Sequence, residues 1–158
     1  MSNGHQPPKD LAAWDQRYVD GPLPWDTGRT DVHLPGVVKE YIASPGKALD
    51  IGCGTGTNAI WLAEQGFDVT GLDLSQTAVK RAKAKSAEAG VSCHLFAADF
   101  LVDEVPGSPF SFVYDRGCFH VFQTAEERSL YASRVRDLLE PDGIWHSLIG
   151  STDGPPRD

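Results

Sequence analysis

The sequence is short of cysteines and has no long apolar run. Its three cysteines, Cys53, Cys93 and Cys118, are odd in number and far apart in a chain of 158 residues. No pair has the spacing of zinc ligands or of a redox motif, and a reduced intracellular compartment fits this usage best. No stretch approaches the roughly 20 apolar residues that a transmembrane helix needs, and the first residues lack the apolar segment of a signal peptide. We therefore expect a soluble, cytoplasmic protein without a metal centre.

Basic residues are also scarce. The chain has 14 Lys and Arg against 22 Asp and Glu, which gives a net charge of −8. Proteins that bind nucleic acid need clustered Lys and Arg to displace the counterions of the phosphate backbone. The charge balance therefore argues against a nucleic-acid partner and favours a small-molecule substrate. Apolar residues make up 41% of the chain, enough for one core, so we expect a single domain over residues 1–158.

What the sequence does have is a regular alternation of strand and helix signals from residue 47 onward. After a short helix at 11–18 and a turn-rich loop at 20–28, this alternation indicates an α/β fold with a mainly parallel sheet flanked by helices, the doubly wound Rossmann-like class. Helix caps are expected at Ser75, and at Thr124 with Glu127 as a capping box. The expected strands are 47–51, 68–72, 91–97, 110–114 and 144–149, and the expected helices are 57–65, 75–89 and 124–139.

A glycine loop follows the first expected strand. Gly52, Gly54 and Gly56 form a G-x-G-x-G pattern between a buried strand and a helix, where a tight turn lets backbone approach a ligand. A dinucleotide fingerprint would need a third glycine at Thr57. Asp50 precedes the loop, and a carboxylate there would repel a pyrophosphate but suits a cationic amino-acid ligand. The loop therefore favours S-adenosylmethionine over NAD as the cofactor.

Acidic residues end the next two expected strands. Asp73 follows the second strand, where a carboxylate can accept both hydroxyls of a ribose. Asp99 follows the third strand and can accept the exocyclic amine of adenine, while Phe100 offers an aromatic face to the purine. Because the carboxyl ends of parallel strands meet at one edge of a sheet, these residues and the glycine loop outline an adenosine pocket.

These elements resemble those of the class I methyltransferases over residues 45–150. A narrower resemblance, to the thiopurine, halide and thiol methyltransferase group, is carried by residues 14–18 (WDQRY), 24–29 (PWDTGR) and 114–120 (YDRGCFH). The resemblance implies an N-terminal lid over residues 1–45, a cofactor-binding core over 46–150 and the start of a substrate loop at 151–158. It also implies a seven-stranded sheet, of which this sequence has the first five strands.

The resemblance further implies roles for individual residues. Trp14 and Trp25 would close over the cofactor from the lid, and Arg116 would line the site after the fourth strand. Arg116 stands where halide-type enzymes tend to have Tyr, which makes halide a less suitable acceptor. We also include Leu74, beside Asp73, and Asp115, beside Arg116, among the cofactor-binding residues.

The chemistry expected of such a site is an in-line methyl transfer that needs alignment more than acid–base catalysis. Arg116 would favour a thiolate by lowering the pKa of a bound thiol, and His120 could accept a proton from a less acidic nucleophile. We therefore expect an S-adenosylmethionine-dependent methyltransferase acting on a small thiol or related soft acceptor. The alternatives are an NAD-binding oxidoreductase and a non-catalytic S-adenosylmethionine-binding module.

The fifth expected strand has consequences for association. It is apolar and has no Lys or Pro within 144–149 to discourage pairing with another chain. If 158 residues are the whole polypeptide, this strand would lie at an open sheet edge. We then expect the chain to form a homodimer through that edge, exchange segments or aggregate.

Overall fold

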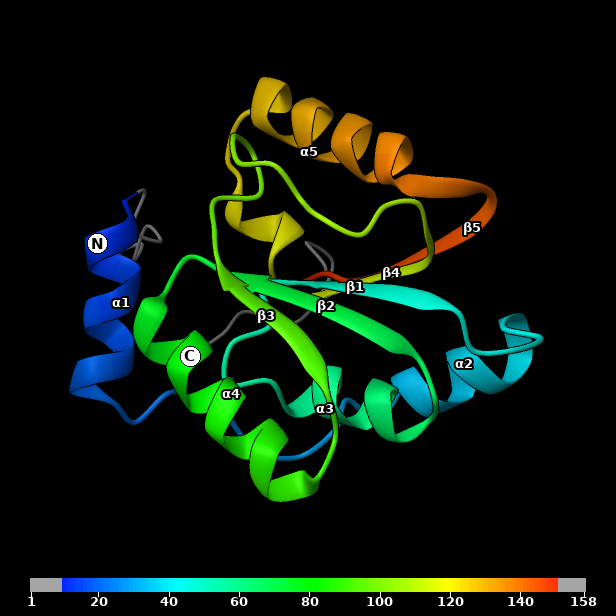
Figure 1. Cartoon of the computed structure of the whole chain (residues 1–158). Helices are drawn as coiled ribbons and strands as arrows, with labels where there is room; N and C mark the ends of the chain where they lie inside the picture. The colour runs from blue at the N-terminus through cyan, green and yellow to red at the C-terminus, as the bar shows by residue number, and fades with distance from the viewer. Residues whose placement is uncertain (1–9, 151–158) are drawn as a thin grey trace.

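A computed structural model of the chain describes residues 10–150 and shows a five-stranded parallel sheet with helices on both faces (Figure 1). The strand order is β3-β2-β1-β4-β5. The Rossmann-like expectation is confirmed. The strands are β1 (Lys47–Ile51), β2 (Asp68–Asp73), β3 (Cys93–Ala97), β4 (Phe110–Arg116) and β5 (Leu139–Leu148), and the helices are α1 (Leu11–Asp20), α2 (Leu34–Tyr41), α3 (Thr57–Glu64), α4 (Gln76–Ala89) and α5 (Ala125–Leu138), with a 3₁₀ turn, η1 (Phe119–Val121).

The order in which strands are added to the sheet reverses between β1 and β4, although all the strands are parallel. The chain moves from β1 outward to β2 and β3, then returns to the other side of β1 with β4, where Ile51 pairs with Asp115. In open parallel sheets, ligands bind at the carboxyl ends of the strands at such a reversal. The topology alone therefore points to the segments that follow Ile51 and Asp115.

The core has a layer on each face of the sheet because successive residues of a strand point to opposite faces. Leu49 and Ile51 pack under Tyr131 of α5, whereas Ala48 packs on the other face against Leu62 of α3. All of these side chains are fully buried. Since helices cover both faces, the central strands β1 and β4 are buried along most of their length rather than at alternate residues.

Local capping signals are confirmed where they were expected. The Ser75 hydroxyl accepts a hydrogen bond from Ala78 N at 3.0 Å at the start of α4, and Gly90 ends the helix in the left-handed region. Thr124 and Glu127 form the reciprocal capping box of α5. These helices therefore begin at the predicted caps.

Two elements differ from the sequence prediction. Helix α2 was not predicted. It follows residues 21–33, which we call the lid loop, and Pro35 near its start and the buried Leu34 mark an amphipathic turn. Strand β5 begins at Leu139 instead of Ile144, because the chain leaves α5 directly into the sheet. Residues 141–143, a Pro-Asp-Gly sequence typical of a turn, are instead part of the strand, at a register shift opposite Phe110 and Phe112.

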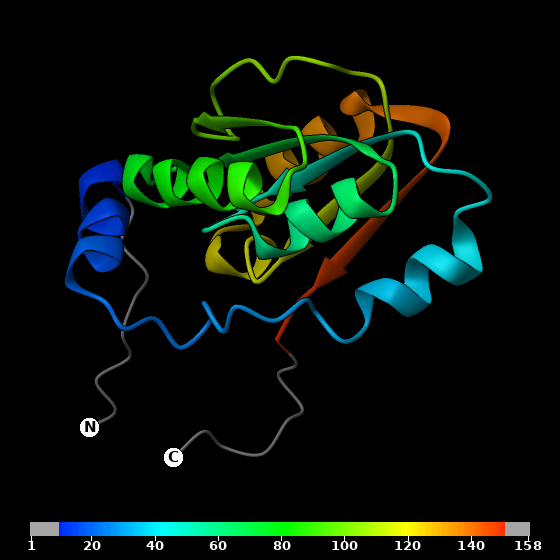
Figure 2. The same ribbon diagram turned by 60° about the horizontal axis from the view of Figure 1, so that its bottom comes forward.

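The segment between α1 and α2 runs along one side of the molecule toward the end of β5 (Figure 2). It brings residues near the N-terminus beside the carboxyl ends of β4 and β5. No helix within residues 10–150 is long and apolar enough to cross a membrane.

Candidate functional site

The glycine loop connects β1 to α3 and has the backbone shape that its sequence requires. Gly52, Gly54 and Gly56 have φ values of +71°, +54° and +85°, a region that favours glycine. At Gly56 there is a second requirement, since an added Cβ would lie 2.8 Å from the Cβ of Ala82 on α4. The loop is held to β2 by Leu72 O, which accepts hydrogen bonds from Gly52 N at 2.8 Å and Cys53 N at 2.9 Å.

Asp73 lies beside this loop, as predicted from its place at the end of β2. Its Oδ2 accepts a hydrogen bond from Gly54 N at 3.0 Å, and its Oδ1 accepts one from Ser75 N at 2.9 Å. Burial raises the pKa of this carboxyl above its ordinary value. A carboxylate oxygen can accept more than one hydrogen bond, so both oxygens retain capacity for a ligand. The next residue, Leu74, is half-buried between β2 and α4.

Asp50 lies behind the glycine loop at 2% exposure. Its Oδ2 has no hydrogen-bond partner among the described residues. Burial, reinforced by the neighbouring carboxylates of Asp115 and Asp73, raises the pKa of Asp50 to about 8. A buried acid with an unpartnered oxygen suits a ligand that carries a positive charge, because such a ligand offsets the cost of ionising it.

The side chain of Asp115, in β4, holds β5 through hydrogen bonds. Its carboxylate accepts hydrogen bonds from Trp145 Nε1 at 2.9 Å, Ser147 Oγ at 3.0 Å and Phe119 N at 3.2 Å. It is fully buried, and burial raises its pKa. These contacts give Asp115 a role in holding the turn after β4, and its contact with a cofactor stays a prediction. The neighbouring Arg116 is exposed at the end of the strand.

Asp99 and Phe100 follow β3 but face different surroundings. Asp99 is half-buried, and its Oδ1 accepts a hydrogen bond from Leu101 N at 2.9 Å. Phe100 points into the core, where its ring centroid lies 4.8 Å from that of Tyr131 and 5.4 Å from the guanidinium carbon of Arg134. The structure thus places Asp99 at the carboxyl edge of the sheet and uses the Phe100 ring for packing.

The two lid tryptophans come together. Trp14 of α1 and Trp25 of the following loop meet edge to face with centroids 6.2 Å apart, and the Arg17 guanidinium lies over both rings at 5.1 and 5.8 Å. Trp25 Nε1 donates a hydrogen bond to the hydroxyl of Tyr18 at 3.3 Å. That hydroxyl lies 3.0 Å from the place a Cβ on Gly54 would occupy. The aromatic pair is therefore anchored on the glycine loop.

Two carboxylates that the sequence analysis did not single out fasten this N-terminal segment to the rest of the domain. Asp15 Oδ1 accepts hydrogen bonds from Ser75 Oγ at 2.6 Å and Thr77 N at 2.8 Å, and its Oδ2 accepts one from Thr77 Oγ1 at 3.0 Å. The hydrogen bond from Ser75, with those from Thr77, lowers the pKa of Asp15. Asp26 Oδ1 accepts a hydrogen bond from Thr55 Oγ1 at 2.8 Å.

Arg116 lines a cavity of about 550 Å³ at the carboxyl ends of β4 and β5. The other walls come from Leu148 of β5 and from residues 27–33 after α1, so the cavity joins segments more than 80 residues apart in sequence. Asp26, next to Thr27 of the lining, accepts a hydrogen bond from Thr55 of the glycine loop. Its lining residues are Thr27, Arg29, Thr30, Asp31, Val32, His33, Arg116 and Leu148.

His120 lies in η1, outside the lining of this cavity. Its Nδ1 accepts a hydrogen bond from Gly150 N at 3.1 Å. In the neutral ring the proton therefore belongs on Nε2, which makes that atom a donor. His120 therefore holds the backbone at Gly150, just after β5. This geometry favours a positioning role over the proton-accepting role expected from the sequence.

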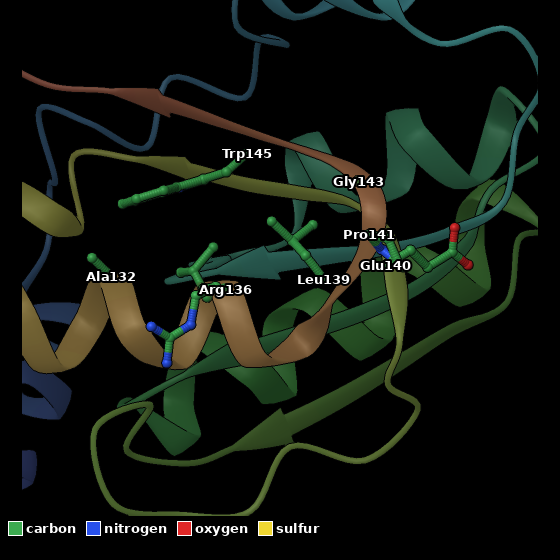
Figure 3. A pocket seen from close by; sticks show the side chains of 8 residues that line it. Ala132, Arg136, Leu139, Glu140, Pro141, Gly143 and Trp145 are labelled. Atoms are coloured by element: carbon green, nitrogen blue, oxygen red, sulfur yellow. The ribbon is translucent and has the colours of Figure 1, made fainter.

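A second cavity, of about 330 Å³, lies between α5 and the first half of β5 (Figure 3). Ala132, Leu139 and Trp145 give it a mainly apolar lining, with Arg136 and Glu140 at its rim. It is next to the start of β5, whereas the glycine loop follows the end of β1, so it lies away from the predicted site. Within residues 10–150, no three His, Cys, Asp or Glu side chains are grouped so as to hold a metal ion.

Comparison with known proteins gives this site a context. Residues 48–143 match a family model described as a methyltransferase domain. The chain is 31% identical over 150 residues to a protein of Arabidopsis thaliana named probable thiol methyltransferase 2, covering 92% of this chain and 66% of that protein. It is 27% identical over 172 residues to thiocyanate methyltransferase 1 of Brassica oleracea, covering 98% and 76% respectively.

Solved structures show the same fold. One, from a study of the conversion of a disulfide bond into a thioacetal group during echinomycin biosynthesis, has a TM-score of 0.78 and 31% identity, covering 87% of this chain and 59% of that chain. Another is the 1,6-didemethyltoxoflavin-N1-methyltransferase of Burkholderia thailandensis with bound S-adenosylhomocysteine, with a TM-score of 0.77 and 24% identity, covering 92% and 63%. All four of these proteins are longer than this chain, which spans about two thirds or less of three of them.

Proposed function

The chain belongs to the S-adenosylmethionine-dependent methyltransferases, and on that basis we propose that it methylates a small molecule at a thiol or related soft nucleophile. Because the chain belongs to this family, the alternative of an NAD-binding oxidoreductase is rejected. The two plant relatives, which are 31% and 27% identical to this chain, are named for thiol and thiocyanate acceptors, and this supports an acceptor that contains sulfur. The observation that carries the proposal is the glycine loop at the strand reversal, joined by Gly54 N to the carboxylate of Asp73.

The described residues fit the cofactor. Asp73 would hold the ribose and Asp99 the adenine amine. A cationic amino-acid moiety would lower the raised pKa of Asp50, and the unpartnered Oδ2 would then carry the opposing negative charge. Trp14 and Trp25 would cover the site from the lid. When bound, S-adenosylmethionine supplies an electrophilic methyl group.

Arg116 is the residue we propose to act on the acceptor. A guanidinium beside a thiol favours the thiolate, so the proton leaves to water and no dedicated base is needed. The thiolate would then form a bond to the methyl group that the bound cofactor supplies, and the electron pair of the former methyl–sulfur bond would stay with the cofactor. Exposure of Arg116 in the cavity leaves it accessible to an acceptor.

A methyl-transfer assay with labelled S-adenosylmethionine tests the proposal. The acceptor panel should contain small thiols, thiopurines, halides and hydroxylated aromatics. We expect transfer to thiols in preference to the other acceptors. Cofactor binding without transfer to any member of the panel would support the alternative of a non-catalytic binding module.

Arg116→Lys provides the test of the residue's role. The substitution keeps the charge but replaces a planar fork with a point charge. We expect turnover on a thiol to fall by about tenfold or more, with a smaller change in cofactor affinity. An unchanged rate together with a large loss of thermal stability would instead identify Arg116 as a structural residue.

A further inference from the structure

The cavity beside Arg116 has an excess of cationic side chains. Arg29 and His33 come from the lid loop, and Arg116 faces the same space from β4. Among residues 10–150, the ion pairs are His94 with Asp68 and Arg136 with Asp137, and neither pair touches this cavity. Three basic side chains therefore line one cavity without an ion-pair partner among residues 10–150, in a chain whose net charge is −8.

The acidic residue in the lining is already engaged. Asp31 is 4% exposed and turns its carboxylate inward. Its Oδ2 accepts a hydrogen bond from the Tyr114 hydroxyl at 2.8 Å, and its Oδ1 accepts one from His33 N at 3.0 Å. Asp31 thus shapes the cavity wall, while the guanidinium groups of Arg29 and Arg116 remain available to a ligand.

The walls of this cavity are fixed relative to the cofactor loop. Asp31 N donates a hydrogen bond to Asn58 Oδ1 on α3 at 2.8 Å, and Asp26 holds Thr55 of the glycine loop at the same distance. Arg116 lies at the end of β4, next to the strand reversal, and Arg29 lies on the lid loop. Two cationic positions therefore face one space from separate, anchored elements, and a ligand can meet both at once.

The size of the cavity indicates what kind of anion it accepts. Its volume of about 550 Å³ is within the range of sites for organic ligands. A water molecule has a share of about 30 Å³ in the liquid, so one small inorganic anion would leave most of the space unfilled. A guanidinium fork matches a carboxylate with two parallel hydrogen bonds.

We propose that the acceptor carries a carboxylate in addition to its sulfur, and that Arg29 and His33 bind this carboxylate while Arg116 faces the sulfur. This inference rests on the proposed function and narrows its substrate class to organic thiols with a second anionic group. A neutral thiol would leave the Arg29 guanidinium without an anionic partner, and a single inorganic anion would leave most of the space unfilled. Arg29 is then a specificity-determining residue.

A matched pair of acceptors tests the proposal. The compounds 4-mercaptobenzoate and 4-mercaptobenzamide have nearly the same shape and differ in the charge of the group opposite the sulfur. We expect kcat/KM to be at least tenfold higher for the carboxylate, mainly through KM. In Arg29→Gln this ratio should fall toward one, whereas the control Arg136→Gln, at the other cavity, should keep the ratio of the unsubstituted chain.

The outcomes separate the two proposals. Equal rates for both acceptors, or a preference that persists in Arg29→Gln, would overturn the carboxylate site and leave thiol methylation standing. If neither acceptor is methylated, calorimetry with 4-(methylthio)benzoate and S-adenosylhomocysteine-loaded protein decides the matter. Binding that is lost in Arg29→Gln supports the carboxylate site even though the proposed reaction has failed. No binding to the unsubstituted chain rejects it.

Discussion

At the scale of single residues, buried carboxylates determine the electrostatics behind the glycine loop. Asp50, Asp73 and Asp115 are close enough that Asp50 is affected by both of the others. Asp73 was predictable because an acid at the end of a strand has one obvious place in a parallel sheet. The engagement of Asp115 with Trp145 and Ser147 was not predictable, since it depends on partners some 30 residues later in the chain.

Asp50 should make the stability of the fold depend on pH. Its pKa is raised from 3.8 to about 8 on folding. A raised pKa contributes stability that is fully present below the unfolded value and is lost as the pH rises through the folded value. Stability should therefore fall between about pH 4 and pH 8, and Asp50→Asn should remove this part of the decline.

Thermal unfolding at several pH values measures this effect. We expect the melting temperature of Asp50→Asn, relative to the unsubstituted chain, to rise by about 5 °C or more between pH 5 and pH 8. Asp142→Asn, at an exposed position, controls for the general loss of one negative charge. A difference that stays constant with pH would show that Asp50 titrates normally.

At the scale of elements, α1 is fastened to the start of α4. Asp15 accepts hydrogen bonds from both Ser75 and Thr77, in the first turn, where the helix dipole also favours a negative charge. The helix start itself could be predicted from sequence because Ser75 is a local signal. The Asp15 contact could not, because a polar pair 60 residues apart leaves no periodic pattern.

This fastening predicts how the lid responds to a substitution. Asp15→Ala should cost about 1–2 kcal/mol in the free energy of unfolding, because it leaves donors at the start of α4 without an acceptor. It should also loosen the Trp14–Trp25 pair and weaken cofactor binding. Denaturant unfolding and tryptophan fluorescence measure the two effects. Gln16→Ala, an exposed neighbour on α1, is the control, and equal behaviour of the two variants would exclude the fastening.

At the scale of the whole molecule, the mainly parallel sheet flanked by helices could be predicted, because strand–helix alternation leaves few topologies. Helix α2 was missed because it is short and its first turn has no side-chain cap that the sequence would reveal. The cavity beside Arg116 was missed as well, since it forms only when the lid loop lies against β4 and β5.

The edge of the sheet carries a prediction about association. Within residues 10–150, β5 pairs with β4 and with no other strand, and Ile149 just beyond it is 53% exposed. Such an edge favours pairing with a second chain, and a lysine beside it discourages this. We expect the 158-residue chain to show a mass that rises with concentration in light scattering, and Ile149→Lys to reduce the rise. A monomer at all concentrations would contradict the expectation.

The central claim is that the glycine loop and Asp73 form an S-adenosylmethionine site, and calorimetric titration of the chain with this cofactor measures it. Loss of a charge-assisted hydrogen bond costs roughly 1.5–3 kcal/mol, or about tenfold to a hundredfold in affinity. We predict that Asp73→Ala raises Kd by that factor for both S-adenosylmethionine and S-adenosylhomocysteine, which share the ribose. Asp68→Ala, at the exposed start of the same strand, should leave both Kd values unchanged. No binding by the unsubstituted chain, or equal affinity in Asp73→Ala, would contradict the assignment of the site.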